Sequence, residues 1–178
     1  YEREKGVYGF IDEFKDVPDK LRAEGIDLLT ILAYGNTLYT ETTSHFPETD
    51  AEIEAFVNYA KDVVERLEGK HNYFELWNEP NIKGGFNATG SGGDVYAELV
   101  KAVYPAVKSV NKDAYLMGLS LSGNPTILSY SNYNFVKKAM ENGAGNNLDA
   151  VSWHPYAEWG TWLGAGNQTP ESFLPNWF

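Results

Sequence analysis

Short apolar segments alternate along the chain with longer segments in which apolar residues recur every three or four positions. The short segments predict four strands, at residues 26–33, 73–79, 114–119 and 149–154. The first of them is apolar almost throughout, which is typical of a strand buried on both faces. The longer segments predict helices at residues 11–24, 94–109 and 133–141, and a fourth between Thr49 and Gly69.

The helix between Thr49 and Gly69 has the clearest end signals. Thr49 and Glu52 form a capping-box sequence, in which each side chain would accept a hydrogen bond from the other residue's backbone N–H. Gly69 is a residue type at which helices commonly end. The apolar residues at helical spacing form the expected buried stripe: Ile53, Val57, Ala60, Val64 and Leu67.

Prolines fall inside two of the other helices. Pro18 lies in the middle of residues 11–24 and is expected to break that helix, and Pro105 is expected to kink the helix at 94–109. In the last helix, four apolar residues are expected to face inward: Phe135, Val136, Ala139 and Met140.

Strands that alternate with helices indicate parallel βαβ units and one α/β domain over residues 1–178. Such units build either an open doubly wound sheet or a closed (β/α)8 TIM barrel. The open sheet usually binds nucleotides at a glycine-rich turn, and neither G-x-G-x-x-G nor G-x-x-x-x-G-K-[ST] occurs in the sequence. Polar residues instead gather at the carboxyl ends of the strands, where a barrel builds its active site: Asn36, Asn78, Glu79, Ser120, Ser122, His154 and Tyr156. The barrel is therefore favoured.

The charge of the chain narrows the range of partners. A formal net charge of -11 and a pI near 4.6 make nucleic acid and anionic membrane surfaces poor partners. With no cysteine the chain has no disulfide, zinc–thiolate site or thiol nucleophile, and no metal-ligand motif occurs. No apolar run is long enough to span a bilayer. The first residues do not resemble a signal peptide, although an extracellular location is the one we expect.

Glu79 is the strongest candidate for chemistry. It ends a predicted strand, follows Asn78 and precedes Pro80, so its carboxyl group would be held rigidly at the mouth of a barrel. Partial burial there can keep a carboxyl group protonated for general acid catalysis. Strand alternation places Glu75, Trp77 and Glu79 on one face and Asn78 on the other. From position alone, the alternative is that Glu79 only caps the turn that follows it.

The string Phe74-Glu75-Leu76-Trp77-Asn78-Glu79-Pro80-Asn81 decides between these alternatives. It resembles the motif at strand four of clan A glycoside hydrolases, which are retaining (β/α)8 enzymes, and is most similar to family 39. The resemblance implies that Glu79 is the acid/base of a retaining O-glycoside hydrolase and that Asn78 binds the sugar 2-hydroxyl. It implies a carbohydrate substrate and no cofactor.

Three further segments carry the same resemblance. Gly6-Val7-Tyr8 resembles the segment after strand two, and Tyr34-Gly35-Asn36 resembles the end of strand three. Trp153-His154-Pro155-Tyr156 is similar to the His-x-Tyr of strand six, whose His and Tyr line the catalytic subsite. Trp159 and Trp162 follow in a glycine-containing loop, where rings are expected to stack on sugar faces or to pack over the barrel rim, and Asn36 is a weaker candidate for substrate binding.

A retaining glycosidase needs a second carboxylate about 5–5.5 Å from the first. Glu75 is four residues from Glu79, about 13 Å along a strand, and is therefore expected to be a paired residue of the barrel interior. In the family the nucleophile is a Glu at the end of strand seven, which would lie beyond Phe178.

Residues 1–178 are therefore expected to form the middle of a barrel, around strands three to six, without the first strands and strands seven and eight. Such a piece would expose sheet edges and part of the barrel core, and would be inactive alone. The alternatives left open are a non-catalytic carbohydrate-binding barrel and an α/β protein that shares only the topology. The sequence indicates neither the sugar, nor the linkage, nor the oligomeric state.

Overall fold

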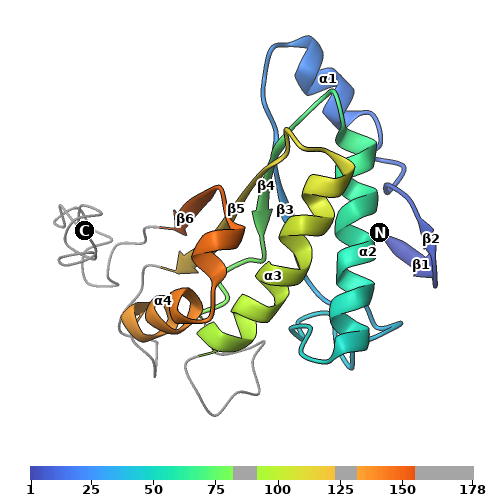
Figure 1. Ribbon diagram of the computed structural model, residues 1–178. Coiled ribbons are helices and arrows are strands. Elements are labelled where there is room, and N and C mark those ends of the chain that lie inside the picture. The colour runs from blue at the N-terminus through green and yellow to red at the C-terminus, as the bar shows by residue number, and fades with distance from the viewer. Residues whose placement is uncertain (82–91, 123–131, 155–178) are drawn as a thin grey trace, which may run out of the picture.

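The computed structural model describes residues 1–81, 92–122 and 132–154 (Figure 1). Its main sheet has four parallel strands in the order β3-β4-β5-β6. These strands are β3 (Leu29–Leu32), β4 (Tyr73–Leu76), β5 (Tyr115–Ser122) and β6 (Ala150–His154). Their order in the sheet follows their order in the chain, as in a barrel, and each predicted strand is confirmed within about three residues at its start.

Helices cover one face of this sheet (Figure 1). They are α2 (Asp50–Leu67), α3 (Gly93–Val110) and α4 (Asn132–Glu141), with the short 3-10 helix η1 (Ala144–Asn147) before β6. The predicted capping box is present, because Glu52 N–H donates to Thr49 Oγ1 and Thr49 N–H donates to the Glu52 carboxylate. Pro105 lies inside α3, and the helix continues through it to Val110.

The core lies between these helices and the sheet. Phe74 and Leu76 of β4 are buried there with Leu116 of β5. Phe135, Val136 and Ala139 of α4 are buried as predicted, whereas Met140 is 38% exposed, so the prediction for Met140 was wrong. Met140 lies one position past the stripe that contacts α3 and therefore faces outward.

The opposite face of the sheet is largely open. Leu29 and Ile31 of β3 are 46% and 44% exposed, and Tyr73 and Tyr115 of the next two strands are 43% and 41% exposed. The prediction that the first strand is buried on both faces was therefore wrong, because no described segment covers this side. The expectation of exposed core residues is confirmed.

The N-terminal region differs most from its prediction. An antiparallel hairpin of β1 (Glu2–Glu4) and β2 (Val7–Tyr8) precedes α1 (Val17–Ala23). Pro18 does not break a helix here: it is in the first turn of α1, where a missing N–H costs nothing, and residues 12–16 form turns instead. The hairpin is tied to α2, because the Arg66 guanidinium donates to the Tyr8 carbonyl.

Candidate functional site

The backbone beyond β4 carries the candidate acid. The strand ends at Leu76, but Trp77 N–H still donates to the Leu32 carbonyl and Glu79 N–H donates to the Ser120 carbonyl. Residues 77–79 are therefore held by both neighbouring strands. They are not extended, because φ is 65° at Trp77 and 49° at Glu79, values that side chains rarely adopt.

These two positive angles break the alternation that the sequence predicts. Trp77 does not share a face with Glu75: its ring is 3% exposed and packs edge-on against Phe46 at 4.8 Å and near Phe56 of α2 at 5.8 Å. The left-handed backbone turns the indole into the helix-covered core. Glu79 is then left on the open side, where it meets His154.

Strained backbone collects at this edge of the sheet. Among the described residues, the non-glycine residues with positive φ lie just past the ends of β3 and β4 or in the carboxyl-terminal half of β5: Tyr34, Trp77, Glu79, Leu119 and Ser120. Each such residue costs on the order of 1–3 kcal/mol, and strain of this kind is concentrated at functional sites. The distribution points to this edge as the functional one.

The positive φ angles in β5 belong to a β-bulge. There a side chain of α3 forms hydrogen bonds with backbone groups of β4 and β5 that the strand pairing leaves unbonded. Regular pairing of β4 with β5 ends at Glu75 and Met117, and the β5–β6 register shifts between Gly118 and Leu121. The buried Tyr96 hydroxyl of α3 donates to the Leu76 carbonyl at 3.1 Å and accepts from Leu119 N–H at 2.8 Å. Burial raises the pKa of Tyr96 well above its ordinary value, so the hydroxyl keeps its proton.

Gly118 makes room for this hydroxyl. A Cβ at that position would lie 2.7 Å from the Tyr96 oxygen and 2.6 Å from the Leu148 side chain. Ser120 and Ser152 close the bulge on its other side, with their hydroxyl oxygens 3.0 Å apart. The ends of β4 and β5 are thus fixed by side chains where the strand ladder is interrupted.

Asn81 fixes the segment just after Glu79. Its side-chain amide donates to the Ser122 carbonyl at 3.1 Å and accepts from Ser122 N–H at 3.0 Å, in a buried position. This residue was missed as a site residue, although it belongs to the Trp-Asn-Glu-Pro-Asn string. Since Trp77, Glu79 and Asn81 are all hydrogen-bonded to β3 or β5, the backbone that carries the Glu79 side chain is held in place.

Three titratable side chains meet on the open side of the sheet. His154, at the end of β6, has Nδ1 3.2 Å from Glu79 Oε1 and Nε2 3.1 Å from Glu75 Oε1. The exposed fractions of the side chains are 4% for Glu75, 16% for Glu79 and 23% for His154. Glu75 is thus the closed end of the cluster, and Glu79 is open to a substrate.

The structure reports on only part of the predicted site. It brings Glu79 and His154 together, and Asn78 is partly buried beside Glu79 in the chain. Tyr156, Trp159 and Trp162 lie outside the described residues. Nowhere in the described ranges does a group of three or more His, Asp or Glu side chains form a possible metal site, and none of the described helices is long and apolar enough to cross a membrane.

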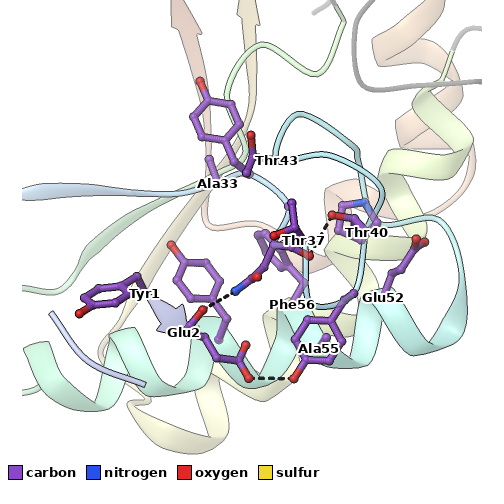
Figure 2. A pocket seen from close by; sticks show the side chains of 15 residues that line it. Tyr1, Glu2, Ala33, Thr37, Thr40, Thr43, Glu52, Ala55 and Phe56 are labelled. Carbon is purple, nitrogen blue, oxygen red and sulfur yellow. Dashed lines mark hydrogen bonds between the residues drawn. The ribbon is translucent and has the colours of Figure 1, made fainter. Parts of the chain in front are cut away.

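Asn36 lies in a separate cavity of about 340 Å³ between the hairpin and α2 (Figure 2). Figure 2 shows Glu2 of β1 among its lining side chains, with Ala55 and Phe56 of α2. The Asn36 amide is already engaged, donating to the Glu2 carbonyl and accepting from Leu38 N–H. Neither Glu79 nor His154 lines this cavity, so the candidate site rests on the carboxylate–imidazole cluster and not on the cavity.

Tyr39 borders the same cavity and stabilises the hairpin. Its hydroxyl donates to Glu2 Oε1 at 2.8 Å, and this hydrogen bond, with burial and the charge of Glu2, raises the pKa of Tyr39 to about 12. The Glu2 carboxylate also accepts from Gly6 N–H within the hairpin. These groups satisfy one another, which indicates a structural role.

No protein-family model matches this chain, and no curated protein matches it. Solved structures do match. A family 39 glycoside hydrolase from the gut symbiont Bacteroides cellulosilyticus WH2 superposes with a TM-score of 0.67 at 26% identity, covering 87% of this chain and 30% of that chain.

Two other glycoside hydrolases match at lower identity. For a psychrophilic family 10 endo-β-1,4-xylanase the TM-score is 0.57 at 17% identity, over 85% of this chain and 51% of that one. For a family 5 lichenase from Caldicellulosiruptor sp. F32 the TM-score is 0.53 at 12% identity, over 96% of this chain and 52% of that one.

The described residues therefore have the fold of part of a glycoside hydrolase (β/α)8 barrel, and the chain spans about half or less of each matched enzyme. The resemblance to clan A glycoside hydrolases, with family 39 among them, is confirmed at the level of structure.

Proposed function

We propose that this chain contributes the acid/base half of a retaining O-glycoside hydrolase site, with Glu79 as the proton donor. The observation that carries the proposal is the position of Glu79: a partly exposed carboxyl group, fixed at the carboxyl end of a barrel strand and within hydrogen-bond distance of His154. The similarity to glycoside hydrolases, one of them at 26% identity, supports the reaction class.

In the proposed reaction Glu79 protonates the oxygen of the leaving group as the glycosidic bond breaks. A second carboxylate attacks the anomeric carbon and forms the glycosyl-enzyme. Glu79, now ionised, takes a proton from water as that water hydrolyses the intermediate. Asn78 binds the 2-hydroxyl of the sugar, and Tyr156, Trp159 and Trp162 are proposed to line the sugar site.

Glu75 is not proposed as the second carboxylate. It lies on the far side of the His154 ring from Glu79 and its side chain is 4% exposed, so no sugar fits between the two carboxyl groups. The nucleophile is instead proposed to be a Glu from a later strand of the same barrel. Residues 1–178 are accordingly proposed to be one part of the catalytic domain.

The test uses the protein that contains this chain and its Glu79→Gln variant. We expect hydrolysis of an unactivated glycoside to fall by about 10²–10⁴-fold, because the proton donor is lost. An aryl glycoside with an acidic leaving group should lose far less in its first step, and azide should restore turnover because it attacks without a general base.

The exposed Glu54 of α2 supplies the matched control, since Glu54→Gln should leave the rate unchanged. Wild-type hydrolysis of the unactivated glycoside by Glu79→Gln would show the assignment to be wrong. Oligosaccharide binding without any hydrolysis by the wild type would favour the non-catalytic carbohydrate-binding alternative.

A further inference from the structure

The ring of His154 faces a carboxylate at each of its nitrogens. Nδ1 is 3.2 Å from Glu79 Oε1 and Nε2 is 3.1 Å from Glu75 Oε1. Glu75 lies in β4 and Glu79 lies three residues past the end of β4, and both carboxylates reach the same ring because the backbone at residues 77–79 is not extended. The estimate of about 13 Å for a straight strand therefore does not apply to these side-chain oxygens.

The protons in these two contacts can be counted. An ionised carboxylate only accepts hydrogen bonds, and a neutral imidazole has one donor and one acceptor nitrogen. Two contacts with ionised carboxylates therefore require a proton on each nitrogen, which makes the ring an imidazolium. A neutral ring would need one of the two carboxyl groups to be protonated toward it.

The two carboxylates differ in what else they can do. Glu79 is the more exposed and needs one oxygen free for its proposed reaction, whereas the Glu75 side chain is buried and only 4% exposed. Within the described part of the chain, Glu75 and Glu79 are the charged groups in contact with His154.

We propose that Glu75 is a positioning residue: it is the counter-ion that keeps His154 as an imidazolium, and His154 in turn holds Oε1 of Glu79, leaving Oε2 for the reaction. This inference rests on the proposed function of Glu79. In the first step the proton leaves Glu79 Oε2 for the leaving oxygen, and the new carboxylate is paired with the imidazolium. In the second step water returns a proton to Glu79. His154 keeps both ring protons throughout.

The proton count can be measured without turnover, by ¹⁵N NMR of histidine-labelled protein at pH 7.5, where a free imidazole is mostly neutral. The chain has three histidines, and His71 is an internal reference for a neutral ring. Its Nδ1 accepts from Leu28 N–H and its Nε2 faces the Pro18 carbonyl, which fixes one tautomer. A His154→Gln variant assigns the His154 resonances.

We expect both nitrogens of His154 to carry a proton in the wild type, and one of these protons to be lost in Glu75→Gln, which keeps the shape and removes the charge. Glu79→Gln is the matched variant and should keep the imidazolium, because Glu75 is still present. A neutral His154 ring in the wild type, or the same loss in Glu79→Gln and none in Glu75→Gln, would overturn the proposal.

Kinetics give a second readout in the protein that contains this chain. Glu75→Gln should lower kcat for an unactivated glycoside by roughly tenfold or more, leave KM nearly unchanged and change the pH profile, because Glu75 contacts no substrate. Unchanged kcat and pH profile would overturn the role of Glu75. Absence of hydrolysis in a wild type whose His154 is an imidazolium would instead overturn the proposed function, so the two failures are distinguishable.

Discussion

The two faces of the four-stranded sheet are built from alternate residues of the same strands, yet they differ sharply. On the helix-covered face Phe74 and its neighbour Leu116 in β5 are fully buried. On the other face Tyr73 and Tyr115 are 43% and 41% exposed, and the buried residue beside them is the acidic Glu75. One face supplies the apolar burial that stabilises the fold, and the other supplies the groups proposed to do chemistry.

The largest expected effect tests this division directly. Phe74→Ala should lower the free energy of unfolding by about 3–5 kcal/mol, because the ring is buried against the helices. Tyr73→Ala, one residue earlier, should cost about 1 kcal/mol or less, mainly through its edge contact with Tyr115. Urea denaturation of both variants measures the difference. Equal losses would mean that the open face is as important for stability as the covered one.

A second pair of variants compares hydroxyl groups on the two faces. Tyr96→Phe removes the partner of a buried carbonyl at Leu76 and a buried N–H at Leu119, so we expect a loss of about 2–3 kcal/mol. Tyr115→Phe removes only an exposed hydrogen bond to the Asp149 carbonyl and should cost a few tenths of a kcal/mol, on the order of a surface substitution. A Tyr96→Phe variant as stable as the wild type would show that the hydrogen bonds of the Tyr96 hydroxyl do not contribute to stability.

A third prediction concerns acid stability on the helix side. Burial tends to raise the pKa of Asp149, but hydrogen bonds from Lys108 and from Leu116 N–H outweigh it and lower the pKa below its ordinary value. A lowered pKa in the folded state stabilises the fold above the unfolded pKa of about 4, and this contribution disappears as the pH falls through the folded value.

Asp149→Asn should therefore cost about 1–2 kcal/mol at pH 7, with a difference from the wild type that shrinks below about pH 4. Thermal unfolding at a series of pH values measures it. The exposed Asp113 provides the control, because Asp113→Asn should change little at any pH. A difference for Asp149→Asn that stays constant down to pH 2 would contradict the linkage.

The smallest expected effect lies at a helix end. Thr49→Ala removes the side-chain acceptor for Glu52 N–H and should cost about 1 kcal/mol. Thr49→Ser keeps the hydroxyl and should be close to neutral. If the loss in Thr49→Ala matches that in Phe74→Ala, local helix formation rather than packing on the sheet would limit stability.

Local rules sufficed for the parts of the fold that depend on neighbours in the sequence. The capping box at Thr49, the end of α2 near Gly69 and the parallel strand order all follow from short patterns. Pro18 was misread because a proline in the first helical turn and one in the middle give the same local signal until the start of the helix is known.

The candidate site was less predictable, because it depends on backbone angles that the residue types at these positions do not indicate. Glycines would have indicated the positive φ angles at residues 77 and 79, but Trp77 and Glu79 adopt them instead. The contact of Glu75 with His154 needs that turn and also the register of β4, β5 and β6 across the sheet. The sequence could indicate Glu79 and His154 separately. Only the assembled sheet shows that His154 lies between Glu79 and Glu75 and contacts both carboxyl groups.

The Tyr96 hydroxyl also turns one backbone amide into a reporter of tertiary structure. Leu119 N–H has its acceptor on α3 and not on a strand, so this amide is protected only while the helix is docked on the sheet. Its hydrogen-exchange rate should therefore follow the separation of α3 from the sheet, even where the strand amides around it follow the opening of the sheet itself. The exchange rate of the Leu119 amide, at the sheet edge that carries Glu79, would thus measure how often α3 separates from the sheet.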